Sequence, residues 1–245
     1  MEIYIGIDDT DNLNTRGTGH HARMLGHSLV EAGLFELRSV TRHQLFVSPS
    51  IPYTSHNSSA SLSGYCTGNI SDLILHAKEF LLKVSAFDSD AGLCVAVKEE
   101  VTPSIMAYGW KAKREILTIE DAFGMIKNTS IYLEGFLNTR IGVIGSLAAV
   151  GLRAGGNDGR LLWTRNLRET TGEFVISDLL EIIDIERVTE KDHTSVNPNA
   201  NILIDEWCRP VMVGGKITLI AEKTENNEPY AYQSASKEYI KSISE

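Results

Sequence analysis

The sequence lacks the features that mark a membrane protein, a disulfide-stabilised protein or a zinc-knuckle protein. No apolar run approaches the roughly 18 residues that a membrane-spanning helix needs. The three cysteines, Cys66, Cys94 and Cys208, are far apart and odd in number, which argues against a disulfide framework and a zinc site. The chain also starts without a basic leader or a cleavage site. We therefore expect a cytoplasmic protein with no membrane partner.

Basic residues are also scarce. The 245 residues include 23 Lys and Arg against 32 Asp and Glu, a net charge of −9. Proteins that grip a long nucleic-acid backbone usually present a basic surface, so the overall charge argues against extended RNA or DNA binding. A local basic face stays open, because residues 140–168 carry five arginines and only one acid, Asp158.

Alternating strand and helix patterns predict an α/β to α+β fold. Apolar alternation predicts strands at 2–7, 36–47, 58–66 and 92–98, and a second group near 160–165, 202–204 and 216–221. Helical spacing predicts helices at 19–33, 70–84, from Pro103 onward and within 142–151, with a weak helix at 234–243. The polar stretch 127–138 is the best candidate boundary. We expect one domain over 1–130 and a second, α+β domain over 131–245.

The first strand ends in a cluster of acids, Gly6-Ile7-Asp8-Asp9-Thr10-Asp11. Because side chains alternate along a strand, Asp9 and Asp11 can point one way and Asp8 the other. Like charges this close repel one another unless a cation or a hydrogen-bond donor lies among them. The cluster therefore predicts Mg2+ bound together with phosphate oxygens, with Asp8, Asp9 and Asp11 as metal ligands and catalytic residues. An Asp-rich turn that caps backbone N–H groups is the structural alternative for at least one of them.

A Gly/Thr loop follows and leads into a helix. In Gly17-Thr18-Gly19 the glycines would let the backbone approach a phosphate, and the free N–H groups of a helix start attract anions. We expect Thr10, Gly17, Thr18 and Gly19 to bind the cofactor phosphates. The alternative is a threonine N-cap beside turn glycines. His20, His21 and His27 do not share a helix face, so a histidine metal site is not expected.

Together these motifs resemble the archaeal tRNA(Ile) 2-agmatinylcytidine synthetase family. The resemblance rests on GIDDTD with its Gly/Thr loop, on Ser-Ile-Pro-Tyr at 50–53, on Ile-Gly-Ser-Leu-Ala-Ala-Val-Gly at 144–151, and on the stretch from Pro210 to Lys223. It implies an N-terminal kinase-like domain followed by a ferredoxin-like domain, with ATP and Mg2+ as cofactors. It also implies phosphorylation of a cytidine oxygen, displacement of the phosphate by agmatine, and an autophosphorylated threonine that matches Thr18 or Thr15.

Two departures from the family bear on the substrate. The sequence has no Cys-x-x-Cys pair for the family's zinc ribbon, and it stops where the family's OB-fold would begin. A Lys- and Arg-containing run of the family is replaced by Thr54-Ser-His-Asn-Ser-Ser59. We expect the catalytic chemistry to be retained and the binding of tRNA to be weaker. The protein would then act on a different substrate, or it would need a partner protein or a second copy of itself.

Further candidates follow from residue type and place. Arg42 is expected to contact ATP, because Arg recognises phosphate by two parallel hydrogen bonds, with a surface ion pair as the alternative. The matching position in the family implies that His56 and Asn57 contact substrate, with an ordinary connecting loop as the alternative. Arg160 and Arg165 are expected to do so beside a Gly-rich loop at 155–159, where a plain hairpin turn is the alternative. Gly142, Gly145 and Gly151 fall in a helical pattern and indicate close helix packing.

Two functional hypotheses follow. The first is an ATP-dependent ligase or kinase-like enzyme that phosphorylates an oxygen of a cytidine-like or small-molecule substrate, so that an amine such as agmatine can displace the phosphate. The second is a non-catalytic ATP-binding sensor, or a subunit of an RNA-modifying complex. The clustered carboxylates favour the enzyme.

Overall fold

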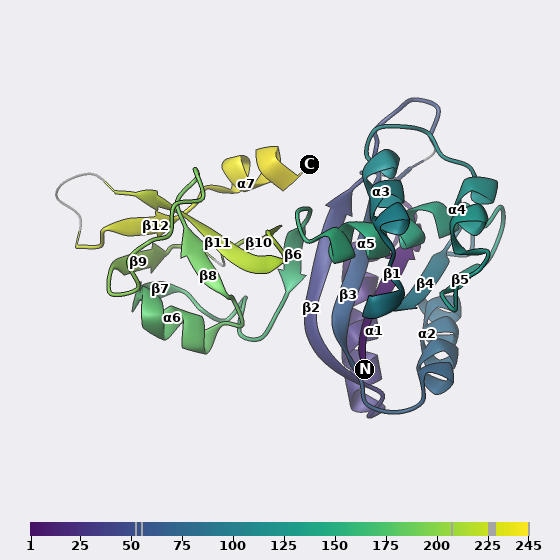
Figure 1. Cartoon of the computed structure of the whole chain (residues 1–245), viewed down its shortest axis with the longest axis horizontal. Helices are drawn as coiled ribbons and strands as arrows, with labels where there is room; N and C mark the ends of the chain where they lie inside the picture. The colour runs from purple at the N-terminus through teal and green to yellow at the C-terminus, as the bar shows by residue number, and fades with distance from the viewer. Residues whose placement is uncertain (52, 55, 207, 225–228, 245) are drawn as a thin grey trace. The chain divides into compact units, whose positions relative to one another are not determined.

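The computed structural model describes residues 1–51, 53–54, 56–206, 208–224 and 229–244. Contacts divide the chain into two compact units, Met1–Gly155 and Gly156–Glu245 (Figure 1). The mixed α/β class expected from the sequence is confirmed. Within the described residues, no helix is both long enough and apolar enough to span a bilayer.

The first unit contains five strands and five α-helices among its described residues. In chain order they are β1 Glu2–Asp8, α1 Thr18–Glu31, β2 Phe35–Gln44, β3 Ser58–Cys66, α2 Ile70–Val84, β4 Gly92–Val97, α3 Pro103–Ala112, α4 Ile119–Ile126, β5 Tyr132–Gly135 and α5 Val143–Gly155. A short 3₁₀ turn, η1, covers Lys98–Glu100. The strands that the alternation predicted at 2–7, 58–66 and 92–98 are all present within a residue or two.

The sheet of the first unit has the order β5-β4-β1-β3-β2, with every neighbouring pair antiparallel. Its first six elements run β1-α1-β2-β3-α2-β4, which is the split βαβ order of ferredoxin-like folds. This order therefore lies in Glu2–Val97, and not after residue 130 where the resemblance had placed a ferredoxin-like domain. It puts the end of β1 beside the start of β4, with Asp8 opposite Gly92.

Helices cover the two faces of this sheet. Gly26 of α1 packs against Leu62, which is paired with Ile5 of β1. The next residue of β1, Gly6, points to the other face, where a Cβ would strike the carbonyl of Ser146 in α5. Because Gly6 and Gly92 have no side chains, α5 can pack directly onto β1 and β4. The buried helix predicted over 142–151 is confirmed.

The predicted boundary at 130/131 is too early by 25 residues, because the division falls after Gly155. β5 pairs with β4, and the apolar face of α5 joins a core with Tyr4, Cys94 and Ile105. The polar stretch at 127–138 indicated a break, but it contains β5 and connects α4 to α5 within one core.

The second unit holds seven short strands and two helices in its described part. They are β6 Arg160–Trp163, β7 Gly172–Val175, α6 Ile176–Ile182, β8 Arg187–Thr189, β9 Asn201–Ile204, β10 Val211–Val213, β11 Lys216–Lys223, β12 Tyr232–Ser234 and α7 Lys237–Ser244. The strands β6-β10-β11-β12-β9-β7 follow one another, and β8 pairs in parallel with β11. A separate apolar core, which includes Ile176, Ile202 and Leu219, holds the unit together.

Candidate functional site

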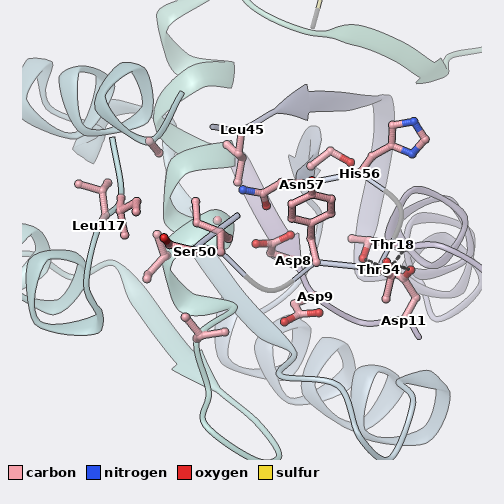
Figure 2. A pocket seen from close by; sticks show the side chains of 18 of the residues that line it. Asp8, Asp9, Asp11, Thr18, Leu45, Ser50, Thr54, His56, Asn57 and Leu117 are labelled. Atoms are coloured by element: carbon pink, nitrogen blue, oxygen red, sulfur yellow. Dashed lines mark hydrogen bonds between the residues drawn. The ribbon is translucent and has the colours of Figure 1, made fainter. Parts of the chain in front are cut away.

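A pocket opens in the first unit at the end of β1. Asp8, Asp9 and Asp11 line it together with Thr18 from α1, and Tyr53, Thr54, His56 and Asn57 line it from the segment before β3. Figure 2 shows Asp11, Thr18 and Thr54 grouped on one side of this pocket, and Leu117 on the opposite side. Leu45, Ile116, Ile141 and Ile144 are also among the lining residues. The pocket therefore has a carboxylate-rich end and an apolar end.

Asp8 is the last residue of β1 and points toward α5. Its carboxylate lies against Gly145, where any Cβ would overlap Asp8 Oδ2. Burial raises the pKa of Asp8 well above its usual value, and the charges of Asp9 and Asp11 raise it further. A carboxyl in this state is stabilised in its charged form by an added cation.

Asp9 follows in a left-handed backbone conformation, with φ of 50°. This region is uncommon for residues other than glycine, although Asp tolerates it better than most. Burial raises the pKa of Asp9 to about 6, with Asp90 and Asp11 as further causes. The turn thus places a second carboxyl group with a raised pKa in the same pocket.

Asp11 differs from Asp8 and Asp9 because both of its oxygens accept hydrogen bonds from threonine residues. Its Oδ1 accepts hydrogen bonds from the backbone N–H of Thr18 at 2.9 Å and the Thr18 hydroxyl at 2.7 Å. Its Oδ2 accepts one from the Thr54 hydroxyl at 3.0 Å. Asp11 therefore fills the capping role at the start of α1, where the N-cap Gly17 has no side chain to do so.

In the predicted phosphate loop, the backbone N–H and the hydroxyl of Thr18 already donate hydrogen bonds to Asp11. Thr18 is 7% exposed, and its hydroxyl also accepts hydrogen bonds from Thr10. Thr10 is fully buried and bonds to His21 rather than facing the pocket. Gly17 and Gly19 flank Thr18, but neither lines the pocket. Phosphate contacts by Thr10, Gly17 and Gly19 stay predictions.

The remaining predicted residues fall in two places. His56 and Asn57 line the pocket, and the Asn57 side chain donates to the carbonyl of Phe46 at 2.7 Å. Arg42 on β2 donates to Ser58 and Gln44, and it is not among the lining residues. Arg160 and Arg165 belong to the second unit, where Arg165 donates to the carbonyl of Glu181. Their roles stay predictions.

Two parts of the resemblance lie outside the described residues. Pro52 of the Ser-Ile-Pro-Tyr motif and Ser55 of the run 54–59 are not described. The predicted packing role of Gly142, just before α5, and of Gly151 within it agrees with the structure: added Cβ atoms there would strike the carbonyls of Asp90 and Ile105.

The acids fit a metal ion that is bound partly by the phosphates of a ligand better than a metal ion whose ligands all come from the protein. Across the described ranges, no three Asp, Glu, His or Cys side chains form a group that could hold a metal ion. Mg2+ is commonly bound by one or two carboxylates plus substrate phosphates. Asp8 and Asp9, whose charged forms are disfavoured as they stand, have the chemistry for that arrangement.

Sequence reasoning missed Asp90, which lies on the loop before β4. Asp90 and Asp88 line a second hollow that also includes Asp9 and Asp11. Asp90 Oδ1 accepts hydrogen bonds from the backbone N–H groups of Thr139 and Arg140, which fixes its carboxylate near Asp9. The Asp-Ser-Asp spacing directly before a strand was a usable signal, once β4 was known to pair with β1.

Comparisons with known proteins point to one kind of fold. No protein-family model and no curated protein matches the chain. Among solved structures, a tRNA fluorescent labeling enzyme is 25% identical with a TM-score of 0.54. Apo TiaS, an agmatidine synthetase that acts on an isoleucine tRNA, is 23% identical with a TM-score of 0.54, and the complex of TiaS with that tRNA and ATP is 24% identical with a TM-score of 0.55. Each match covers 62% of this chain, which spans only 35–36% of those longer proteins.

Proposed function

We propose that the first unit binds ATP with Mg2+ and that the protein is an ATP-using enzyme of the tRNA-modification type. The observation that carries the proposal is the pair Asp8 and Asp9, two carboxylates with raised pKa values at the end of β1 in one pocket. The structural likeness to TiaS, one of whose structures is a complex with tRNA and ATP, supports it.

In this proposal Asp8 and Asp9 hold the metal that accompanies the ATP phosphates. When bound, Mg2+ neutralises charge on the phosphate oxygens. The carboxylates fix the position of the triphosphate, and the apolar end of the pocket offers contacts to the rest of the ligand. Catalysis by this arrangement would come from positioning and charge neutralisation rather than from a protein nucleophile.

The reaction we propose is phosphoryl activation followed by C–N bond formation. The γ-phosphoryl group passes to an oxygen of a cytidine-like base or of a small molecule, and ADP leaves. An amine, such as agmatine, then forms a bond to the activated carbon and phosphate departs. tRNA and agmatine are the partners that the TiaS complexes suggest, and a cytoplasmic location fits such a substrate.

The test is Mg2+-dependent ATP turnover by the whole chain, alone and with total RNA plus agmatine, with the products separated. We expect turnover to fall by about 100-fold in Asp9→Asn. The matched control is Asp72→Asn, the same change at an exposed acid in the first turn of α2. Nucleotide binding without turnover under every condition would replace the enzyme with an ATP-binding sensor or subunit. Equal turnover in both variants would reject the site.

A further inference from the structure

Four side chains form a continuous hydrogen-bonded chain beneath the acidic pocket. Asp11 Oδ1 and Thr18 Oγ1 are 2.7 Å apart, Thr18 Oγ1 and Thr10 Oγ1 are 3.1 Å apart, and Thr10 Oγ1 and His21 Nδ1 are 2.9 Å apart. Thr10 is fully buried, while Thr18 and His21 are each 7% exposed. The chain links the β1 end of the pocket to the inner face of α1.

The chemistry of each group sets the direction of every hydrogen bond. The Thr18 hydroxyl donates its single proton to Asp11 Oδ1. The Thr18 oxygen then accepts from the backbone N–H of Thr10, at 3.2 Å, and from the Thr10 hydroxyl. Because the Thr10 proton is used there, the Thr10 oxygen must accept from His21. His21 therefore carries a proton on Nδ1.

This direction leaves Thr18 with no spare hydrogen-bonding capacity. A hydroxyl offers one donor and two acceptor lone pairs, and all three are used by Asp11 and Thr10. Asp11 is held in the same way, since Thr18 occupies its Oδ1 and Thr54 its Oδ2. The segment Thr10–Asp11, which follows Asp9, is thus held by hydrogen bonds to Thr18 at the start of α1.

We propose that Thr10 and His21 are positioning residues, which fix Thr18 and Asp11 and so hold the Asp8–Asp9 turn in shape for its ligand. The hydrogen-bond chain itself stands on the geometry, and only its effect on nucleotide binding rests on the proposed function. Neither residue lines the pocket, so each acts through its neighbours.

The first test addresses the direction of the chain and needs no ligand. Nitrogen NMR of the full chain labelled in its histidine rings distinguishes a proton on Nδ1 from one on Nε2. The His21 signals are assigned by their loss in His21→Asn. We expect His21 to carry its proton on Nδ1. A neutral His21 protonated on Nε2 would reverse the last hydrogen bond and overturn the proposal.

The second test addresses the effect on the site. Thr10→Val removes the hydroxyl at nearly constant shape, Thr10→Ser keeps it, and Thr67→Val makes the same change at an exposed threonine that donates to Gly33. The readout is the Kd for a Mg2+ complex of a non-hydrolysable ATP analogue. We expect about tenfold weaker binding for Thr10→Val, from the loss of one to two buried hydrogen bonds. Thr10→Ser and Thr67→Val should stay within about twofold of the wild type.

Two variants of His21 distinguish a lost hydrogen bond from a folding defect. His21→Asn places an amide N–H close to the position of Nδ1, so it should retain binding, whereas His21→Phe should not. Equal affinity in Thr10→Val and Thr67→Val, or full affinity in His21→Phe, would overturn the proposal. If the wild type binds no nucleotide, the proposed function fails, and the NMR result still decides the hydrogen-bond chain.

Discussion

The backbone of Gly145 lies against the carboxylate of Asp8, so closely that a Cβ on Gly145 would overlap Asp8 Oδ2 and come within 3.0 Å of Leu45 Cδ1. Gly145 stands in the first turn of α5, and Asp8 ends β1. The helix and the acid that lines the pocket are thereby in direct contact. The space for the buried carboxyl exists because residue 145 has no side chain.

Gly145→Ala should displace Asp8 without unfolding the chain, because the obstructing atoms belong to side chains. We expect a loss of roughly 1 kcal/mol in the free energy of unfolding, at the low end for overpacking. Nucleotide affinity should fall as well. The control is Gly124→Ala in α4, where nothing lies within 4 Å of an added Cβ. That change should stabilise the helix by about 0.5–1 kcal/mol. Urea unfolding of both variants measures the difference, and equal effects would contradict the contact.

Asp9→Asn should make the metal-free protein more stable while it disables the pocket. The raised pKa, about 6, means that the ionised carboxylate costs the fold free energy at neutral pH. Removing the charge should therefore add on the order of 1 kcal/mol at pH 7, after allowance for solvent screening. Asparagine also tolerates the left-handed φ of this position.

The pH dependence of that gain follows from the same shift. Between pH 7 and about pH 4 the folded wild type takes up the Asp9 proton before the unfolded chain does, so the unfavourable contribution of Asp9 to stability decreases as pH falls. The advantage of Asp9→Asn should shrink over this range. Urea unfolding at several pH values without divalent cations is the measurement. An advantage that is constant or grows toward pH 4 would contradict the assigned cause.

Thr18 should stay unmodified when the wild-type chain is incubated with ATP and Mg2+. The resemblance implied a phosphorylated threonine at Thr18 or Thr15. Thr18 is only 7% exposed, and its hydroxyl oxygen already uses both lone pairs, so it has no free pair for attack on phosphorus. Thr15 is exposed, so its hydroxyl is the more accessible of the two. Phosphopeptide mapping by mass spectrometry checks this, and phosphate on Thr18 would contradict it.

Two cysteines should report the unfolding of the two units separately. Cys94 in β4 is fully buried, and Cys208 in the second unit is 1% exposed. Burial raises the pKa of both thiols, to about 12 at Cys208, so neither forms the reactive thiolate at neutral pH. We expect no labelling by a thiol reagent in the native protein and full labelling in urea. Rapid native labelling of either residue, located by mass spectrometry, would show that its unit opens.

Local patterns predicted the longer strands and helices, but they missed short elements such as β5 and the pairing of segments that are distant in the sequence. Ile3, Ile5 and Ile7 alternate within one strand, so β1 was visible in the sequence. The pairing of β5 with β4 was not, because four residues carry little periodic signal and their partner lies almost forty residues earlier. The unit boundary was therefore placed 25 residues too early.

The site shows the same limit. The acids Asp8, Asp9 and Asp11 were visible as a cluster, but their different environments depend on Gly145, Asp90 and Thr54, which come from other parts of the chain. Residue spacing alone could not show that Asp11 is the acid that accepts hydrogen bonds from Thr18 and caps α1, or that Asp8 and Asp9 line the pocket without hydrogen bonds from Thr18. It also could not show that Arg42 turns to Ser58 and Gln44.

The most direct test of the central claim is calorimetric titration of the whole chain with a non-hydrolysable ATP analogue, with and without Mg2+, in the wild type, Asp9→Asn and Asp72→Asn. If Asp8 and Asp9 hold the metal on the phosphates, the wild type and Asp72→Asn bind only with Mg2+, and Asp9→Asn binds at least about tenfold more weakly. Binding that is independent of Mg2+, or equal in all three proteins, would contradict the account.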